Sequence, residues 1–236
     1  MKIKHFLLTI MALAIIASSC GQKVPGNLKL KNEKDTLSYC LGADVAGSLK
    51  SAKLDAIDYD AFLKGMDDVF KDKETLIKKD TLKQIINNYI MQAREKAWQK
   101  NLEDGQKFLE ENKTRAGIIT TESGLQYEII TEGTGKAPIE TSIVVAHYSG
   151  TLIDGTVFDS SYDKKPIEIA LNGVIRGWTE GLQLMKEGAK FKFYIPTELA
   201  YGMNVRPGGK IEPNMALIFE VELVEVKENP DAEKQN

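Results

Sequence analysis

The distribution of proline, glycine and apolar residues changes near residue 112, and this change sets the fold class. From residue 35 to 112 there is almost no Pro and little Gly, and apolar residues recur at steps of three and four, the spacing of one helical face. From residue 113 to 227 apolar and polar residues alternate between Gly-bearing turns, as in an antiparallel sheet. We therefore expect an α+β protein in which an all-helical domain precedes a sheet domain, and 236 residues are enough for both cores.

Three helices are expected in the first domain: residues 36–51, a helix capped by Asp58, and a long helix from about Asp80. The third keeps an apolar stripe over about thirty residues, or about 45 Å. Gly105 is not expected to end it, because one Gly costs a helix only about 1 kcal/mol. Two short helices cannot cover such a stripe, so we expect a homodimer formed through these helices; the alternative is a monomeric stalk whose stripe packs locally.

The second domain is expected to hold one sheet covered by one short helix. Phe219, Val221 and Leu223 fall on one face of the last strand, and that face needs an apolar cover. Residues 178–185 place Trp178, Leu182 and Met185 at helical spacing and can supply it. The predicted strands are residues 126–132, 142–152, 167–171, 190–195 and 216–226.

The N-terminus is typical of an export signal. Lys2 and Lys4 precede the apolar residues 6–17, which are too few to span a bilayer but match a signal-peptide core. The next residues, Ala17-Ser18-Ser19-Cys20, resemble a bacterial lipobox, so we expect a signal peptide over residues 1–19 and a lipidated Cys20. The alternative is an ordinary signal peptide with a chance Cys. The expected location is the bacterial cell envelope, lipid-anchored in the outer membrane and facing the periplasm. Residues 20–34 are expected to form the anchor and a flexible tether, and residues 228–236 a disordered tail.

Charge, cysteine and histidine content exclude several functions. The net charge is −3 and no basic run follows the first few residues, so no nucleic-acid partner is expected. The two histidines, His5 and His147, stand far apart and predict no metal site, and no cofactor is expected. If Cys20 carries lipid, Cys40 has no disulfide partner, and its apolar helical context predicts a small buried hydrophobe.

One short run of residues indicates a binding pocket. Residues 174–178, Val-Ile-Arg-Gly-Trp, place two branched aliphatics and an indole beside a Gly at the start of the short helix. Four other aromatic residues surround this run in sequence and could form the walls: Tyr148, Phe158, Tyr201 and Phe219. Taken singly, each would more often be a core residue. Together they predict an apolar pocket of a kind that suits proline.

The order and spacing of these motifs resemble the FKBP-type peptidyl-prolyl cis-trans isomerases. The resemblance covers residues 114–227 and rests on the runs at 147–150, 155–161, 174–178, 200–202 and 217–223. The helical part is similar to the macrophage-infectivity-potentiator branch of bacterial envelopes, through the runs at 38–42, 60–65, 108–113 and 123–127. That branch forms dimers through its helices, in agreement with the overlong stripe.

The resemblance implies a role for each matching residue. Trp178 would be the floor of the proline pocket, and the N–H of Ile175 and the hydroxyl of Tyr201 would bind client carbonyls. Asp159 would act electrostatically, not as a general base. The chain departs from the family pattern at Ile167, where an aromatic is frequent, and at Arg206, where His is frequent. The implied catalytic residues are Tyr148, Phe158, Asp159, Trp178, Tyr201 and Phe219, and the implied substrate-binding residues are Ile167, Val174, Ile175, Ala200 and Ile211.

The expected function is therefore isomerisation of X-Pro bonds during the folding of exported, proline-containing polypeptides. The barrier of about 18–20 kcal/mol comes from amide resonance, so rotation needs no acid, base or nucleophile. The alternative is a chaperone or binding module that holds unfolded clients with little isomerase activity.

Overall fold

The computed structural model describes residues 26–54 and 56–230. The contacts within the chain divide it into two compact units that meet between Asn88 and Tyr89. This boundary falls inside the long third helix, whereas the sequence analysis places it after residue 112. The expected signal peptide, Cys20, the first part of the tether and the end of the tail lie outside the described residues.

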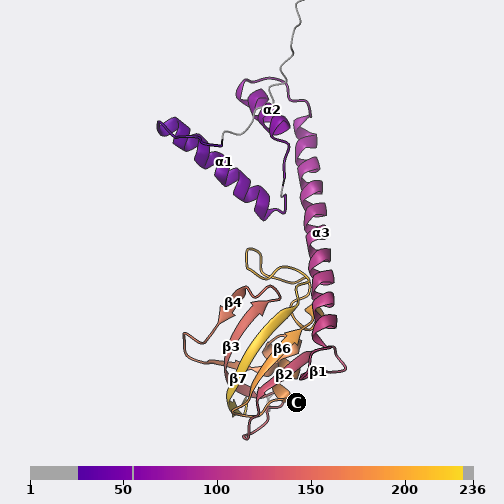
Figure 1. Cartoon of the computed structure of the whole chain (residues 1–236). Coiled ribbons are helices and arrows are strands. Elements are labelled where there is room, and N and C mark those ends of the chain that lie inside the picture. Colours follow the sequence, from indigo (N-terminus) through magenta and orange to yellow (C-terminus); the bar gives the residue numbers. More distant parts are fainter. Residues whose placement is uncertain (1–25, 55, 231–236) are drawn as a thin grey trace, which may run out of the picture. The chain divides into compact units, whose positions relative to one another are not determined.

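In the part of the chain that the structure describes, three helices precede the sheet, as predicted (Figure 1). The side chain of Asn32 accepts a hydrogen bond from the N–H of Asp35 at 2.9 Å, and Asp58 accepts one from Ala61 at 2.8 Å. Both are N-cap contacts, so the predicted start after Asp58 is confirmed. None of the helices in the described part of the chain is both long and apolar enough to cross a bilayer. The helices are α1 (Glu33–Ser51), α2 (Tyr59–Phe70) and α3 (Lys79–Asn112).

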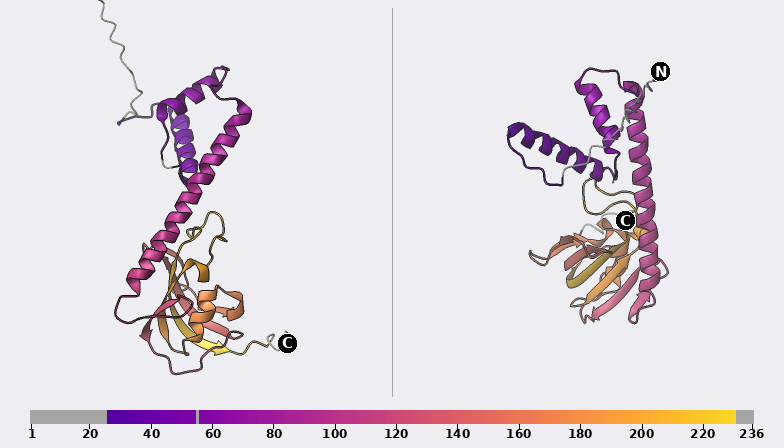
Figure 2. Two further views of the ribbon diagram at one scale, coloured as in Figure 1. Left: turned by 90° about the vertical axis from the view of Figure 1, so that its right-hand side faces the viewer. Right: turned by 45° about the horizontal axis from the view of Figure 1, so that its top comes forward.

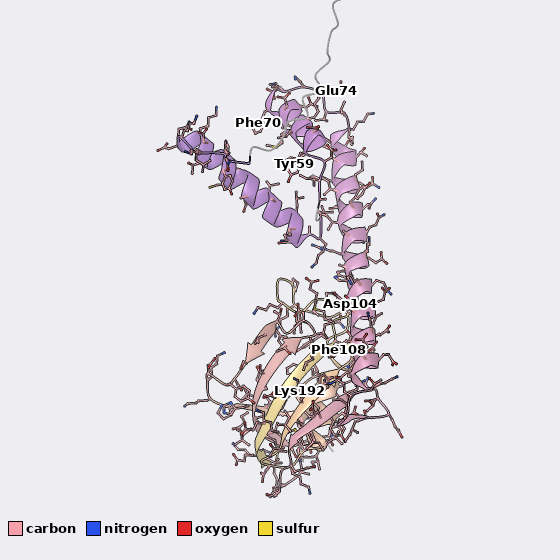
Figure 3. The ribbon with its side chains drawn as sticks, in the orientation of Figure 1. Tyr59, Phe70, Glu74, Asp104, Phe108 and Lys192 are labelled. Atoms are coloured by element: carbon pink, nitrogen blue, oxygen red, sulfur yellow. The ribbon has the colours of Figure 1, made fainter. Side chains whose placement is uncertain are left out.

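The apolar side chains of α1 and α2 are largely exposed. α1 buries none of its residues, and Tyr39 is 61% exposed. Phe70, labelled with Tyr59 on α2 in Figure 3, is 79% exposed. Cys40 is exposed too, so the prediction that it is buried is wrong. The reason is that no other part of the described chain covers the face of α1 on which it lies.

The C-terminal half of α3 packs on the sheet of its own unit. Gly105 lies so close to this sheet that an added Cβ would stand 3.1 Å from the Cβ of Ala216. The ring of Phe108 lies 6.0 Å from that of Tyr194, and the Nζ of Lys192 lies 5.9 Å from the Tyr194 ring; Phe108 and Lys192 are labelled in Figure 3. The stripe on α3 is therefore divided, because this half covers the sheet while Ile86 and Tyr89 are exposed.

The C-terminal unit is built on one antiparallel sheet of seven strands (Figure 1). The strand order is β1-β2-β6-β7-β3-β4, and β5 pairs with β3. β1 and β4 were not predicted, because their residues, Ile-Ile-Thr and Val-Phe-Asp-Ser, do not alternate between apolar and polar. The strands are β1 (Ile118–Thr120), β2 (Gln126–Thr131), β3 (Ile143–Leu152), β4 (Val157–Ser160), β5 (Ile167–Ala170), β6 (Lys190–Ile195) and β7 (Leu217–Lys227).

The inner face of the sheet carries the core, and the short helix α4 (Arg176–Gln183) lies on it, as predicted (Figure 2). Phe219, Val221 and Leu223 of β7 are all buried there, together with Leu182 and Met185. Two short 3-10 helices, η1 (Leu171–Gly173) and η2 (Thr197–Leu199), were not predicted. They turn the chain into and out of the region of α4 and β6.

Two glycines allow α4 to contact β6 directly. A Cβ added at Gly177 would lie 2.5 Å from the side chain of Ile195, and one added at Gly181 would lie 2.7 Å from the ring of Phe193. Atoms cannot pack that closely, so any side chain at either position would push the helix away from the sheet. The spacing of four residues places both glycines on the same face of α4.

We therefore predict that Gly181→Ala destabilises the C-terminal unit by about 1–3 kcal/mol, although Ala is the better helix former. Denaturant unfolding followed by tryptophan fluorescence measures this, because Trp98 and Trp178 both belong to this unit. Gly173→Ala in the same unit is the matched control, since a Cβ there meets nothing within 4 Å. An unchanged midpoint for Gly181→Ala would show that α4 does not depend on this close contact.

Candidate active site

A cavity of about 880 Å³ lies between α4, the inner face of the sheet and the loop that precedes β7. Its size is within the usual range for pockets that bind small ligands. All the residues that the sequence analysis placed in the pocket line this cavity: Tyr148, Phe158, Asp159, Ile167, Val174, Ile175, Trp178, Ala200, Tyr201, Ile211 and Phe219.

Four aromatic rings form a connected floor and wall. The ring of Trp178 meets Tyr148 at 5.4 Å and Phe219 at 5.3 Å between centroids, nearly edge-on in both cases. Phe158 meets Phe219 at 5.4 Å, again edge-on. Edge-to-face contacts at these distances are favourable, so the rings hold one another in position. Trp178 is 4% exposed and forms the floor.

The room for these rings comes from a glycine on β3. A Cβ added at Gly150 would lie 2.5 Å from the ring of Phe158 and 2.9 Å from the ring of Phe219. Any side chain there would displace two walls of the cavity. The strand pairing places this glycine opposite Phe219 on β7 and Asp159 on β4, so the register of three strands defines the wall.

The polar contact inside the cavity joins Tyr148 and Asp159. The hydroxyl of Tyr148 donates a hydrogen bond to Oδ2 of Asp159, and Oδ1 accepts one from the N–H of Ser160 at 2.9 Å. Burial, and next the bond to the Asp159 carboxylate, raise the pKa of Tyr148 above its usual value because both disfavour the tyrosinate. Tyr148 therefore remains a hydrogen-bond donor at neutral pH, and its bond fixes the carboxylate against the pocket wall.

Two further residues that carry polar groups line the cavity. Ile175 is the N-cap of α4 and lines the cavity, and its N–H takes part in no hydrogen bond within the described residues. Tyr201 is 42% exposed at the opening. Both groups are available to bind carbonyl oxygens of a peptide. Within residues 26–54 and 56–230, no group of His, Cys, Asp and Glu side chains is arranged to hold a metal ion.

The loop between η2 and β7 supplies lining residues that the sequence analysis did not assign. It contributes Asn204, Val205, Arg206, Gly209 and Lys210, while Ile169, Gly173 and Arg176 come from elsewhere. The loop is attached to α3: Asn101 Nδ2 donates to the carbonyl of Pro213 at 3.0 Å, and Asn214 Nδ2 donates to the carbonyl of Trp98 at 3.2 Å. No periodic pattern in the sequence predicts an irregular loop that folds over a cavity. The sequence shows that the loop contains charged residues, but not that they line the cavity.

Comparison with known proteins agrees with this geometry. Residues 135–224 match the model of the FKBP-type peptidyl-prolyl cis-trans isomerases, and residues 34–129 match the domain amino-terminal to that isomerase. The outer membrane protein MIP of Legionella longbeachae is 38% identical over 235 residues, covering 96% of this chain and 99% of that protein. The chain belongs to the FKBP-type peptidyl-prolyl cis-trans isomerase family. It is thus an enzyme that accelerates rotation about the peptide bond preceding proline.

Two further relatives match across most of this chain. A probable FKBP-type isomerase, FkpA, of Neisseria meningitidis is 42% identical over 199 residues, covering 80% of this chain and 73% of that protein. The crystal structure of FkpA from Escherichia coli has a TM-score of 0.70 at 36% identity, and the match covers 86% of this chain and 100% of that one. The predicted α+β architecture of the FKBP type is therefore confirmed.

Proposed function

We propose that this isomerase acts on X-Pro bonds of exported polypeptides by binding proline against Trp178 and withdrawing the twisting amide from water. The observation that carries the proposal is the set of four contacting rings around one cavity. The proline ring is compact and apolar, and it fits a site whose walls are aromatic and aliphatic.

The physical basis is a difference in polarity along the reaction. A planar amide is dipolar because of resonance, and the twisted transition state loses that resonance. Transfer from water to an apolar cavity therefore costs the transition state less than either planar ground state. Such a site lowers the barrier by differential binding and moves no proton.

Each polar group at the cavity then has a binding or electrostatic role. The N–H of Ile175 and the hydroxyl of Tyr201 bind client carbonyls and orient the chain on either side of the proline. Tyr148 holds the carboxylate of Asp159 in place, where the negative charge acts on the twisting amide. The carboxylate serves as a fixed charge and not as a base.

A homodimer through the N-terminal helices completes the proposal. Large apolar side chains of α1 and α2 are exposed at a density that a monomer rarely tolerates, and they include Leu37, Leu41, Met66 and Phe70. The match of residues 34–129 to the family's amino-terminal domain supports a shared role for this surface. Two pockets in one dimer would increase the effective concentration of a second site for a long client.

Anchoring in the outer membrane through a lipid on Cys20 is also part of the proposal. The lipobox-like residues Ala17 to Cys20 support it, as does the name of the Legionella longbeachae relative, an outer membrane protein. A single acyl group binds membranes weakly, so several chains on one Cys would be needed for stable attachment. The bacterial cell envelope is the location that these observations share.

The first prediction about function separates catalysis from client holding. Tyr148→Ala and Asp159→Ala should each reduce kcat/KM on a neutral Leu-Pro peptide by about ten- to a hundredfold, the effect of losing a hydrogen bond to a charged group, which is worth about 1.5–3 kcal/mol. Tyr162→Phe is the control, because this tyrosine stacks on His147 and does not line the cavity. If both alanine variants still suppress the aggregation of an unfolded client, holding is a function separate from catalysis. If the wild-type protein does not accelerate isomerisation of the peptide, the proposed isomerase activity is wrong.

The second prediction concerns assembly. Leu37→Glu/Leu41→Glu places two charges on one face of α1 and should convert the dimer to a monomer in light scattering, because like charges cannot be buried against an apolar partner. Ser38→Glu is the control on a neighbouring exposed position of the same helix. A wild-type chain that is monomeric at micromolar concentration would contradict the helical interface.

The third prediction concerns the anchor. Expressed from its full reading frame in a bacterium that exports it, the wild-type protein should enter the detergent phase in phase partitioning, whereas Cys20→Ser should remain in the aqueous phase. The physical reason is that acyl chains contribute about 0.8 kcal/mol per buried CH₂ group. Equal partitioning of the two proteins would refute lipidation.

A further inference from the structure

The opening of the proline cavity carries an excess of positive charge. Three cations line the cavity: Arg176, Arg206 and Lys210. One acidic residue, Asp159, lines it with them, and its carboxylate accepts hydrogen bonds from Tyr148 and from the backbone of Ser160. The chain as a whole has a net charge of −3, so this excess is local and does not reflect a basic protein.

The three cations are placed on two elements that border the cavity. Arg176 is the first residue of α4 and follows Ile175, which also lines the cavity. Arg206 and Lys210 stand in the loop between η2 and β7, which α3 holds through Asn101 and Asn214. All three side chains are exposed and are therefore accessible to the client residues on either side of the proline.

Lys210 is held across the opening. Its Nζ donates a hydrogen bond to the carbonyl of Val157 at 2.6 Å, at the start of β4 and next to Phe158. An ammonium has three donors, so this bond leaves two for a ligand. The charge is fixed at the wall of the cavity, and a client carboxylate would bind it with little further loss of side-chain freedom.

These three cations differ from others of the same unit in their lack of a close acidic partner within the described residues. Other cations of the same unit form ion pairs, such as Lys190 with Glu220 at 2.6 Å and Lys227 with Glu168 at 2.7 Å. Among the residues that the structure describes, no ion pair includes Arg176, Arg206 or Lys210. A binding surface with unpaired charges of one sign selects ligands of the opposite sign.

We infer that this isomerase prefers client segments that carry Asp or Glu within a residue or two of the proline. The inference rests on the proposed function and names its substrate class. The apolar floor binds the proline ring, and the basic opening distinguishes one X-Pro sequence from another. Because the three charges are exposed, each contact with a client carboxylate is a weak one, and the preference arises from their sum.

The test measures kcat/KM on peptides with neutral end groups, in a protease-free fluorescence assay on the full-length protein. Peptides carry Glu, Leu or Lys immediately before the proline, and a second set carries them immediately after it. At about 20 mM salt the Glu peptide should exceed the Lys peptide by at least about fivefold in one of the two sets. In about 1 M salt, where the Debye length is about 3 Å, the ratio should approach one.

A charge-removing variant locates the effect. Arg206→Gln/Lys210→Gln should reduce the ratio of kcat/KM for the Glu peptide to kcat/KM for the Lys peptide about threefold or more. The uncharged Leu peptide shows in the same protein whether the proline pocket is still active. Lys83→Gln/Lys186→Gln is the matched control: it makes the same change in net charge at two exposed lysines that do not line the cavity, and it should retain the wild-type ratio.

The possible outcomes separate this inference from the proposed function. Acceleration of the Leu peptide with equal rates for Glu and Lys in both sets would overturn the charge preference and leave the isomerase intact. A Glu preference that is unchanged in the double variant would also overturn it, because the preference would then arise elsewhere. No acceleration of any peptide would refute the proposed function itself.

Discussion

Trp178 reaches the floor of the proline cavity because α4 lies in direct contact with β6, and the rest of the site depends on that contact. Gly177 and Gly181 allow it, since a side chain at either position would collide with Ile195 or Phe193. Once the helix is seated, the indole meets the rings of Tyr148 and Phe219 at its edges. The burial that stabilises the unit therefore also builds the pocket, so a change that loosens α4 affects folding and binding together.

The opening of the cavity depends on a second contact, between α3 and the loop that precedes β7. This loop has no ladder of its own, yet it carries Tyr201 and two of the three cations at the opening. Asn214, at a positive φ of 64°, donates from its backbone to Gly202 at 2.9 Å and from its side chain to α3. The C-terminal half of α3 thus acts as part of the enzyme unit and not only as a connector (Figure 2).

Sequence analysis predicts what depends on local pattern and misses what depends on which surfaces meet. The helices, the main strands and the pocket residues follow from periodicity and from closely spaced motifs such as residues 174–178. Periodicity shows that a stripe is apolar, but not what covers it. For this reason the packing of α3 on the sheet was not predicted, and Cys40 was wrongly expected to be buried. Lys210 lines the cavity through an irregular loop whose path no spacing rule encodes.

The cavity separates the two tasks of an isomerase that must choose among many prolines. Its floor is buried, so the contacts that favour the twisted amide act in a dry environment and do not depend on salt. Its opening is exposed, so charge contacts there are weak, screened by salt and easily altered by substitution. Arg206 and Lys210 are exposed residues of an irregular loop, so they are free to change with the clients. Evolution of client preference in such an enzyme therefore requires no change in Trp178, Phe219 or the glycines that seat α4.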